Sequence, residues 1–153
     1  MINLSNLNQY RESEFIEAKK ALGGIPESLW ETYSAFANSC GGVILLGVRE
    51  DPDRTLHAVN LPAPKAMVRD LWEDFNNPDI VSVNILTEED ITIEDLDGKH
   101  IIVVNVPPAE IKNKPVYIGR DIFKGTYCRI GDGDFRCSED EIREMLKQQE
   151  ECK

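Results

Sequence analysis

The sequence contains no long hydrophobic run, which excludes one class of protein. Although 41% of the 153 residues are hydrophobic, the ~18 consecutive apolar residues that a membrane-spanning helix needs occur nowhere. Residues 1–9 also lack the basic start and apolar centre of a secretory signal peptide. We therefore expect a cytoplasmic protein that does not bind a membrane.

Paired cysteines are absent as well. The four cysteines form no C-x-x-C pair and have no ligand-like spacing with His57 or His100. A chain of this length can bury roughly two-thirds of its unfolded surface, so it needs no disulfide or metal for stability. We expect free thiols at Cys40, Cys128, Cys137 and Cys152.

The sequence has no G-x-x-x-x-G-K-[ST] stretch, the loop that binds phosphates in P-loop proteins. No cofactor is therefore expected within these residues.

Basic residues are scarce, with 17 Lys and Arg against 28 Asp and Glu, a net charge of −11 and a pI near 4.6. Since a nucleic-acid-binding protein must neutralise phosphates, the overall charge opposes that function. The charge is unevenly distributed, however. Residues 99–137 hold seven bases and four acids, whereas residues 87–98 and 138–153 are acidic. A nucleic-acid contact is therefore expected within residues 99–137.

Hydrophobic periodicity predicts three elements in the first third of the chain. Imperfect alternation over residues 12–20 predicts a short, partly exposed strand. Apolar residues at helical spacing predict a helix over residues 27–38, which Gly41 and Gly42 bring to an end. The continuous apolar run at residues 43–48 then predicts a central strand buried on both faces.

The remaining pattern predicts an α+β fold. A second amphipathic helix is expected over residues 64–76, and a capping box at Ser138 and Glu141 begins a last helix that ends near residue 149. Strands are expected at 81–86, 91–96, 101–106, 116–118 and 126–130, with a hairpin at Asp97-Gly98. We predict a single domain, residues 1–153, with one mixed, largely antiparallel sheet and about three helices packed on it.

Three stretches of the chain resemble the Schlafen-type AlbA-like domain. The first, E-S-E-F-I-E-A-K at 12–19, is similar to the opening E-x-x-x-x-E-F-K, with Ala18 in place of an aromatic residue. The second is A-F-A-N-S-C-G-G-V-I-L-L-G-V at 35–48, which is similar to the motif that joins a helix to a buried strand. The third combines K-P-V-Y at 114–117 with Y-C-R-I-G at 127–131.

The resemblance implies a DNA-binding domain from the N-terminal part of a bacterial ATP-binding transcriptional regulator or a RecG-like helicase-related protein. It implies that ATP binds in a missing C-terminal region, which is also an expected partner of the domain. DNA, or alternatively RNA, is the expected ligand, and a homodimer is a further expectation.

A candidate nucleic-acid surface follows from the basic stretch and its interleaved aromatic residues Tyr117, Phe123, Tyr127 and Phe135. The alternative is that these aromatic residues belong to the core and that the bases are merely solvated. The candidate contact residues are Lys112, Lys114, Arg120, Lys124, Arg129 and Arg136.

The resemblance also implies a second function, because eukaryotic relatives in the Schlafen family are nucleases with three carboxylates. The matching residues are Glu12, Glu17 and Asp51, with Glu50 as an alternative third. Such a set could hold Mg²⁺ or Mn²⁺ for phosphodiester cleavage. A separation of five residues puts Glu12 and Glu17 on opposite faces of a regular strand, so the chain would have to bend between them. The alternative is that these carboxylates form surface ion pairs.

A third function is also open. The acidic faces of the chain could meet a basic partner, the missing ATP-binding region or a second copy, as in a protein-interaction or dimerisation module.

Overall fold

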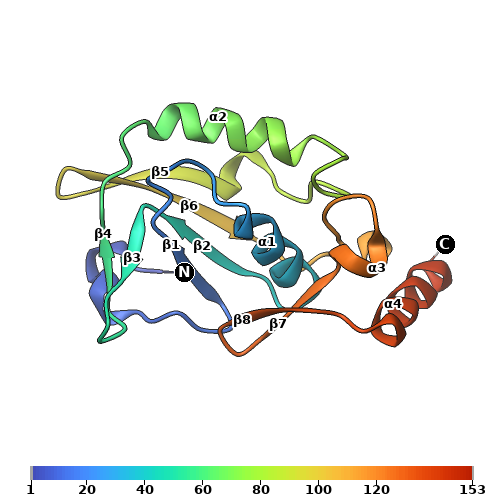
Figure 1. The fold of residues 1–153 in the computed structure, drawn as a ribbon. Coiled ribbons are helices and arrows are strands. Elements are labelled where there is room, and N and C mark those ends of the chain that lie inside the picture. The colour runs from blue at the N-terminus through green and yellow to red at the C-terminus, as the bar shows by residue number, and fades with distance from the viewer. Residues whose placement is uncertain (1, 153) are drawn as a thin grey trace.

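The computed structural model describes residues 2–152, and its elements follow one another around a central sheet (Figure 1). In chain order they are η1 (Leu4–Gln9), β1 (Ile16–Lys19), α1 (Ser28–Asn38), β2 (Gly42–Leu46), β3 (Val48–Glu50), β4 (Leu56–Ala58), α2 (Pro64–Phe75), η2 (Glu88–Asp90), β5 (Ile91–Leu96), β6 (Lys99–Val106), η3 (Ile111–Asn113), α3 (Ile122–Gly125), β7 (Tyr127–Ile130), β8 (Gly133–Arg136) and α4 (Glu139–Glu151).

The main sheet has four strands in the order β1-β2-β6-β5. β1 is parallel to β2, while β2 with β6 and β6 with β5 are antiparallel. The α+β class, the mixed sheet and the three longer helices are thus confirmed. The prediction of one sheet is wrong, because β3-β4 and β7-β8 form separate two-stranded sheets.

The separate sheets begin where the chain bends. The apolar run at 43–48 crosses Gly47, whose positive φ of 85° ends β2 and directs Val48 into β3. A Cβ at Gly47 would lie 2.7 Å from Leu61, so the bend also needs the space that glycine leaves. β2 is otherwise the buried central strand that the sequence predicts, lying between β1 and β6.

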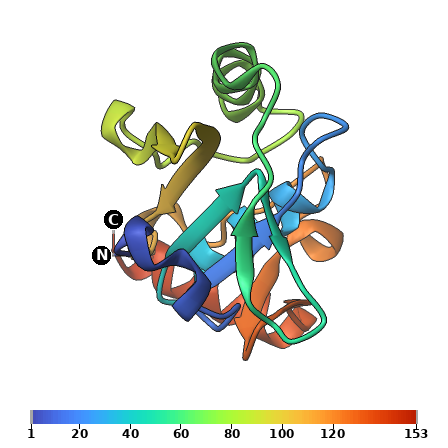
Figure 2. The ribbon, with the colours of Figure 1, turned by 90° about the vertical axis from the view of Figure 1, so that its left-hand side faces the viewer.

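The two faces of the main sheet carry two hydrophobic clusters. On one face, α1 and α2 cover the sheet and contribute Tyr33, Phe36 and Phe75 to the larger cluster. On the other face, η1 and β4 cover the sheet with Leu7 and Leu56. In Figure 2, α2 is seen along its axis above the strands, and η1, in dark blue, lies below it at the other side of the strands. Burying one such side chain stabilises the fold by about 1.5–3 kcal/mol.

The predicted strand at 81–86 is wrong. The segment forms only a single bridge, between Val81 and Ile118. The Tyr33 hydroxyl donates to the Val83 carbonyl at 2.6 Å and accepts from the Ile85 N–H at 3.1 Å. Because this helix side chain satisfies the backbone, no neighbouring strand is required there.

The predicted strand at 116–118 is wrong for the same reason. The Asn38 side chain at the end of α1 accepts from the Val116 N–H at 2.8 Å and donates to the Val116 carbonyl at 2.8 Å. The segment is extended, but it forms only isolated bridges to Val81 and Thr126.

The four cysteines are free, as expected. Burial raises the pKa of Cys137 to about 12, so this thiol stays protonated at neutral pH. No helix among residues 2–152 has both the length and the apolar character needed to cross a membrane.

Candidate functional site

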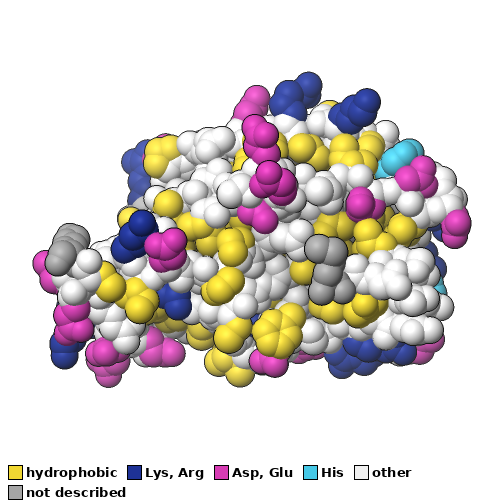
Figure 3. Space-filling view, turned by 180° about the vertical axis from the view of Figure 1, so that it is seen from behind, with side chains coloured by type: hydrophobic (Ala, Val, Ile, Leu, Met, Phe, Trp, Pro, Cys, Tyr) yellow, Lys and Arg dark blue, Asp and Glu magenta, His cyan; other side chains and the backbone are white. Residues whose placement is uncertain are grey.

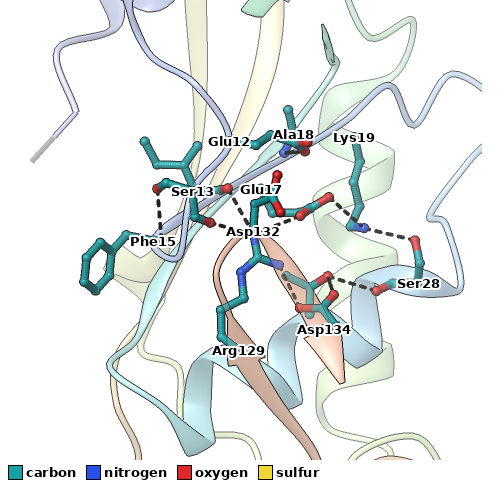
Figure 4. A network of polar contacts seen from close by, with 12 residues as sticks. Glu12, Ser13, Phe15, Glu17, Ala18, Lys19, Ser28, Arg129, Asp132 and Asp134 are labelled. Carbon is teal, nitrogen blue, oxygen red and sulfur yellow. Dashed lines mark hydrogen bonds and ion pairs between the residues drawn. The ribbon is translucent and has the colours of Figure 1, made fainter. Parts of the chain in front are cut away.

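One carboxylate of the opening motif, Glu17, and Asp134 on β8 flank a buried arginine. Arg129 on β7 extends its guanidinium towards β1, and its side chain is 1% exposed. Nη1 donates to Asp134 Oδ1 at 2.7 Å, and Nη2 donates to Glu17 Oε1 at 3.0 Å (Figure 4). We call Glu17, Arg129 and Asp134 the arginine node.

Backbone and aromatic groups also contact the guanidinium. Nη2 also lies 2.8 Å from the Ser13 carbonyl and 3.2 Å from the Ile16 carbonyl. The ring of Phe36 on α1 lies below the guanidinium, 4.8 Å from its central carbon. Arg129 is therefore held by β1, α1 and β8 together.

The two carboxylates of the node have further donors. The Thr32 hydroxyl on α1 donates to Asp134 Oδ2 at 2.6 Å. Lys19 Nζ lies 3.7 Å from Glu17 Oε2 and donates to the Ser28 hydroxyl at 3.0 Å. Each carboxylate is thus bonded by a base or hydroxyl as well as by Arg129.

Glu12 lies beside the node and is held in a different way. Its Oε2 accepts from the Ala18 N–H at 3.0 Å. Partial burial raises the pKa of Glu12 above its usual value; the Ala18 N–H lowers it, and the Glu17 carboxylate raises it again. The pKa of Glu50 is also raised, by desolvation and then by the negative charge of Glu12.

Asp51 belongs to another cluster. Its Oδ1 accepts from Arg49 Nε at 2.7 Å, and its Oδ2 lies 3.2 Å from His57 Nε2. The bend expected in the opening motif is present. There, the N–H of Ser13 donates to the carbonyl of Ile16, the first residue of β1. Asp51 is therefore held by Arg49 and His57 and not by the residues of the node.

The predicted basic residues do not form one surface. Arg129 is buried in the node, so it is not available to a phosphate. Lys112 pairs with Glu110 at 3.4 Å and Arg120 with Asp79 at 3.0 Å. Within residues 2–152, Lys114 and Lys124 make no ion pair. On the face seen in Figure 3, basic and acidic side chains alternate at the α4 end.

The predicted aromatic residues divide between the core and the surface. Tyr127 is buried, and its hydroxyl donates to Glu31 at 3.1 Å. Phe135 is 51% exposed and Phe123 is also exposed, with the guanidinium of Arg143 5.2 Å above its ring. On β7, Ile130 is 62% exposed.

Comparisons with known proteins agree with the fold and the motifs. The sequence pattern of the family described as Schlafen, AlbA_2 matches residues 12–138. This chain belongs to the Schlafen AlbA_2 family. Comparison with curated proteins found no match.

Two solved structures resemble this Schlafen AlbA_2 domain. One is the N-terminal domain of a RecG-related protein from Nitrosomonas europaea, with 34% identity and a TM-score of 0.63 over 90% of this chain and 94% of that one. The other is the DIP2311 protein from Corynebacterium diphtheriae, with 16% identity and a TM-score of 0.56. The alignment covers 89% of this chain but 27% of that chain, and at 16% identity the similarity shows the fold alone.

The metal site that the Schlafen resemblance implies does not fit this AlbA_2 domain. Glu17 is bonded to Arg129 and Lys19, and Asp51 to Arg49 and His57. Among residues 2–152, no three His, Cys, Asp or Glu side chains are arranged to hold a metal ion. We therefore derive no metal-dependent step.

Sequence reasoning missed the roles of Asp134 and Thr32 in this AlbA_2 domain. The sequence did contain a signal that Arg129 points inwards. Alternation along β7 puts Arg129 on the same face as Tyr127 and opposite Ile130. The carboxylate that meets Arg129 from β8 could be expected only once the register of β7 and β8 was known, in which Arg129 faces Asp134.

Proposed function

We propose that this domain binds nucleic acid, and primarily DNA, through the two-stranded ribbon formed by β7 and β8. The larger protein in this proposal is a bacterial ATP-binding transcriptional regulator or a RecG-like helicase-related protein. The single observation that carries the proposal is the outer face of the ribbon, where Ile130 and Phe135 are 62% and 51% exposed.

The shape of the ribbon supports this proposal. A two-stranded antiparallel ribbon is narrow enough to enter the major groove of duplex DNA. Cys128 faces Phe135 across the ribbon and Ile130 faces Gly133, so Ile130 and Phe135 share a face. An exposed aromatic ring can also stack on the base of a single strand, which is worth about 1–3 kcal/mol per base.

Bases near the ribbon supply the electrostatic component. Arg136 is exposed at the end of β8, and Lys124 is exposed on α3, which leads directly into β7. Lys112, Lys114 and Arg120 lie on the segments before α3. Arg129 is left out of this surface because its charge is already paired with Glu17 and Asp134.

The net charge of −11 limits how strongly this domain binds alone. Each phosphate contact releases counterions, so log K should fall with log salt by about 0.9 per contact on duplex DNA. The five proposed bases set the upper limit of that slope. A second copy, or the ATP-binding region expected in the full protein, would add further contacts.

The test is fluorescence anisotropy of labelled duplex and single-stranded DNA in low salt. The double variant Lys124→Glu and Arg136→Glu should weaken binding by about tenfold or more, because two phosphate contacts become repulsive. The control is Lys65→Glu with Arg69→Glu, which changes the net charge equally but on α2. Equal weakening by both pairs, or no binding of either DNA, contradicts the proposal.

The same titrations distinguish the alternatives. Labelled RNA tests the choice between DNA and RNA. Probe cleavage that requires Mg²⁺ or Mn²⁺ and disappears in Glu17→Gln would support the nuclease instead. Light scattering that shows a dimer without any nucleic-acid binding would support the dimerisation module.

A further inference from the structure

The arginine node and the adjacent Lys19 together carry opposite charges in equal number. Arg129 and Lys19 carry two positive charges, and the two carboxylates bonded to them, Glu17 and Asp134, carry two negative charges. These four side chains are therefore balanced in charge without any additional cation.

The guanidinium also takes the acceptor positions that a metal ion would need. Mg²⁺ requires oxygen ligands at 2.0–2.1 Å in near-octahedral geometry. Glu17 Oε1 and Asp134 Oδ1 instead point at Nη2 and Nη1, at 3.0 and 2.7 Å. The carbonyl oxygens of Ser13 and Ile16, which could complete a set of oxygen ligands, also accept from Nη2. Four oxygens of one cluster are thus directed at one cation that the chain supplies.

We propose that the Arg129 guanidinium is the resident cation of this carboxylate cluster, and that the cluster binds no divalent metal while Arg129 is in place. This arrangement differs from the metal-holding carboxylates that the Schlafen resemblance implies. The inference is independent of nucleic-acid binding by the ribbon.

Removing the guanidinium should therefore create a metal site. In Arg129→Met, whose side chain is shorter and uncharged, Glu17 and Asp134 lose their shared cation. Their oxygens and the Ser13 carbonyl then surround a space that a hard cation can neutralise. A matched control is Arg49→Met, which releases the carboxylate of Asp51 outside the node.

The experiment is titration with MnCl₂ alone, in which electron paramagnetic resonance measures free Mn²⁺ and a thermal melt measures stability. Up to about 1 mM Mn²⁺, the weak end of protein cation sites, the wild type and Arg49→Met should bind no stoichiometric ion. Arg129→Met should bind one equivalent, and its Tm should rise with Mn²⁺. The additional substitution Glu17→Gln should abolish both effects.

Two results would overturn the inference. One is stoichiometric Mn²⁺ binding by the wild type that is lost in Glu17→Gln and kept in Asp51→Asn. The other is a folded Arg129→Met that binds no Mn²⁺.

If Arg129→Met does not fold, a triple variant provides the test. The triple variant Glu17→Gln, Arg129→Met and Asp134→Asn removes the carboxylates together with their cation, so its Tm should exceed that of Arg129→Met. A triple variant no more stable than Arg129→Met would show that Arg129 does not act as the counter-ion. The wild-type titration then decides the metal question by the outcomes already given.

Discussion

At the scale of single residues, basic side chains that lie close together in the chain differ in burial and in role. Lys124 and Arg136 are exposed, whereas Arg129 extends inwards and binds Glu17 and Asp134. Charge counted along residues 99–137 shows a basic stretch, but it does not distinguish an exposed base from a buried one. The ion pairs with Glu17 and Asp134 and the packing of Phe36 under the guanidinium bury Arg129, whereas Arg136 lies exposed at the end of β8.

Glu12 provides a prediction about pH at this scale. Its pKa is raised in the folded state, so the native protein binds its proton more tightly than the unfolded chain does. The stabilisation is fully present below the usual pKa of 4.5 and is lost as pH rises through the raised value. Glu12→Gln removes this titration and retains an oxygen that can accept from the Ala18 N–H.

The expected result is a Glu12→Gln variant that is more stable than the wild type at pH 7 and differs from it less at pH 4. Urea unfolding at a series of pH values measures both differences. Glu14→Gln, on an exposed side chain of the same segment, is the control. A Glu12→Gln variant that loses stability at pH 7 would contradict this explanation.

At the scale of elements, helices and strands differ in how far the sequence predicts them. The expected helices at 27–38 and 64–76 and the last helix begin and end within two residues of α1, α2 and α4. Their periodicity and caps are local, including the Ser138 hydroxyl that accepts from the Glu141 N–H. The strands expected at 81–86 and 116–118 depend instead on the distant side chains Tyr33 and Asn38, which no local pattern reveals.

At the scale of elements, the prediction concerns Asn38. Its side chain bonds the Val116 N–H and carbonyl and donates to the Tyr127 carbonyl at 2.9 Å, so it joins the end of α1 to two segments. Asn38→Ala leaves these partly buried groups without partners, and each such loss costs about 1–3 kcal/mol.

Chemical denaturation of Asn38→Ala should show a loss of about 1–3 kcal/mol or more in the free energy of unfolding. Asn6→Ala changes an exposed asparagine in η1 and should cost far less. Equal costs for the two variants would show that Asn38 does not connect these segments.

At the scale of the whole molecule, an acidic protein exposes two large hydrophobic side chains on the β7-β8 ribbon. Residues 87–98 and α4 are strongly acidic, whereas the ribbon exposes Ile130 and Phe135 on one face. Family membership and the class of fold follow from motifs that control chain direction, such as the glycines between α1 and β2. The absence of a metal-ready carboxylate set among residues 2–152 did not follow from those motifs, because it depends on where Arg129 points.

The most direct test of the central proposal is an NMR titration of the ¹⁵N-labelled domain with short duplex and single-stranded DNA at low salt. The proposal predicts that the largest amide shifts occur at Ile130, Phe135 and Arg136 on the ribbon and at Lys124 before it, and that added salt reverses them. Shifts confined to α2 or to β3 and β4, or no shifts with either DNA, would contradict it.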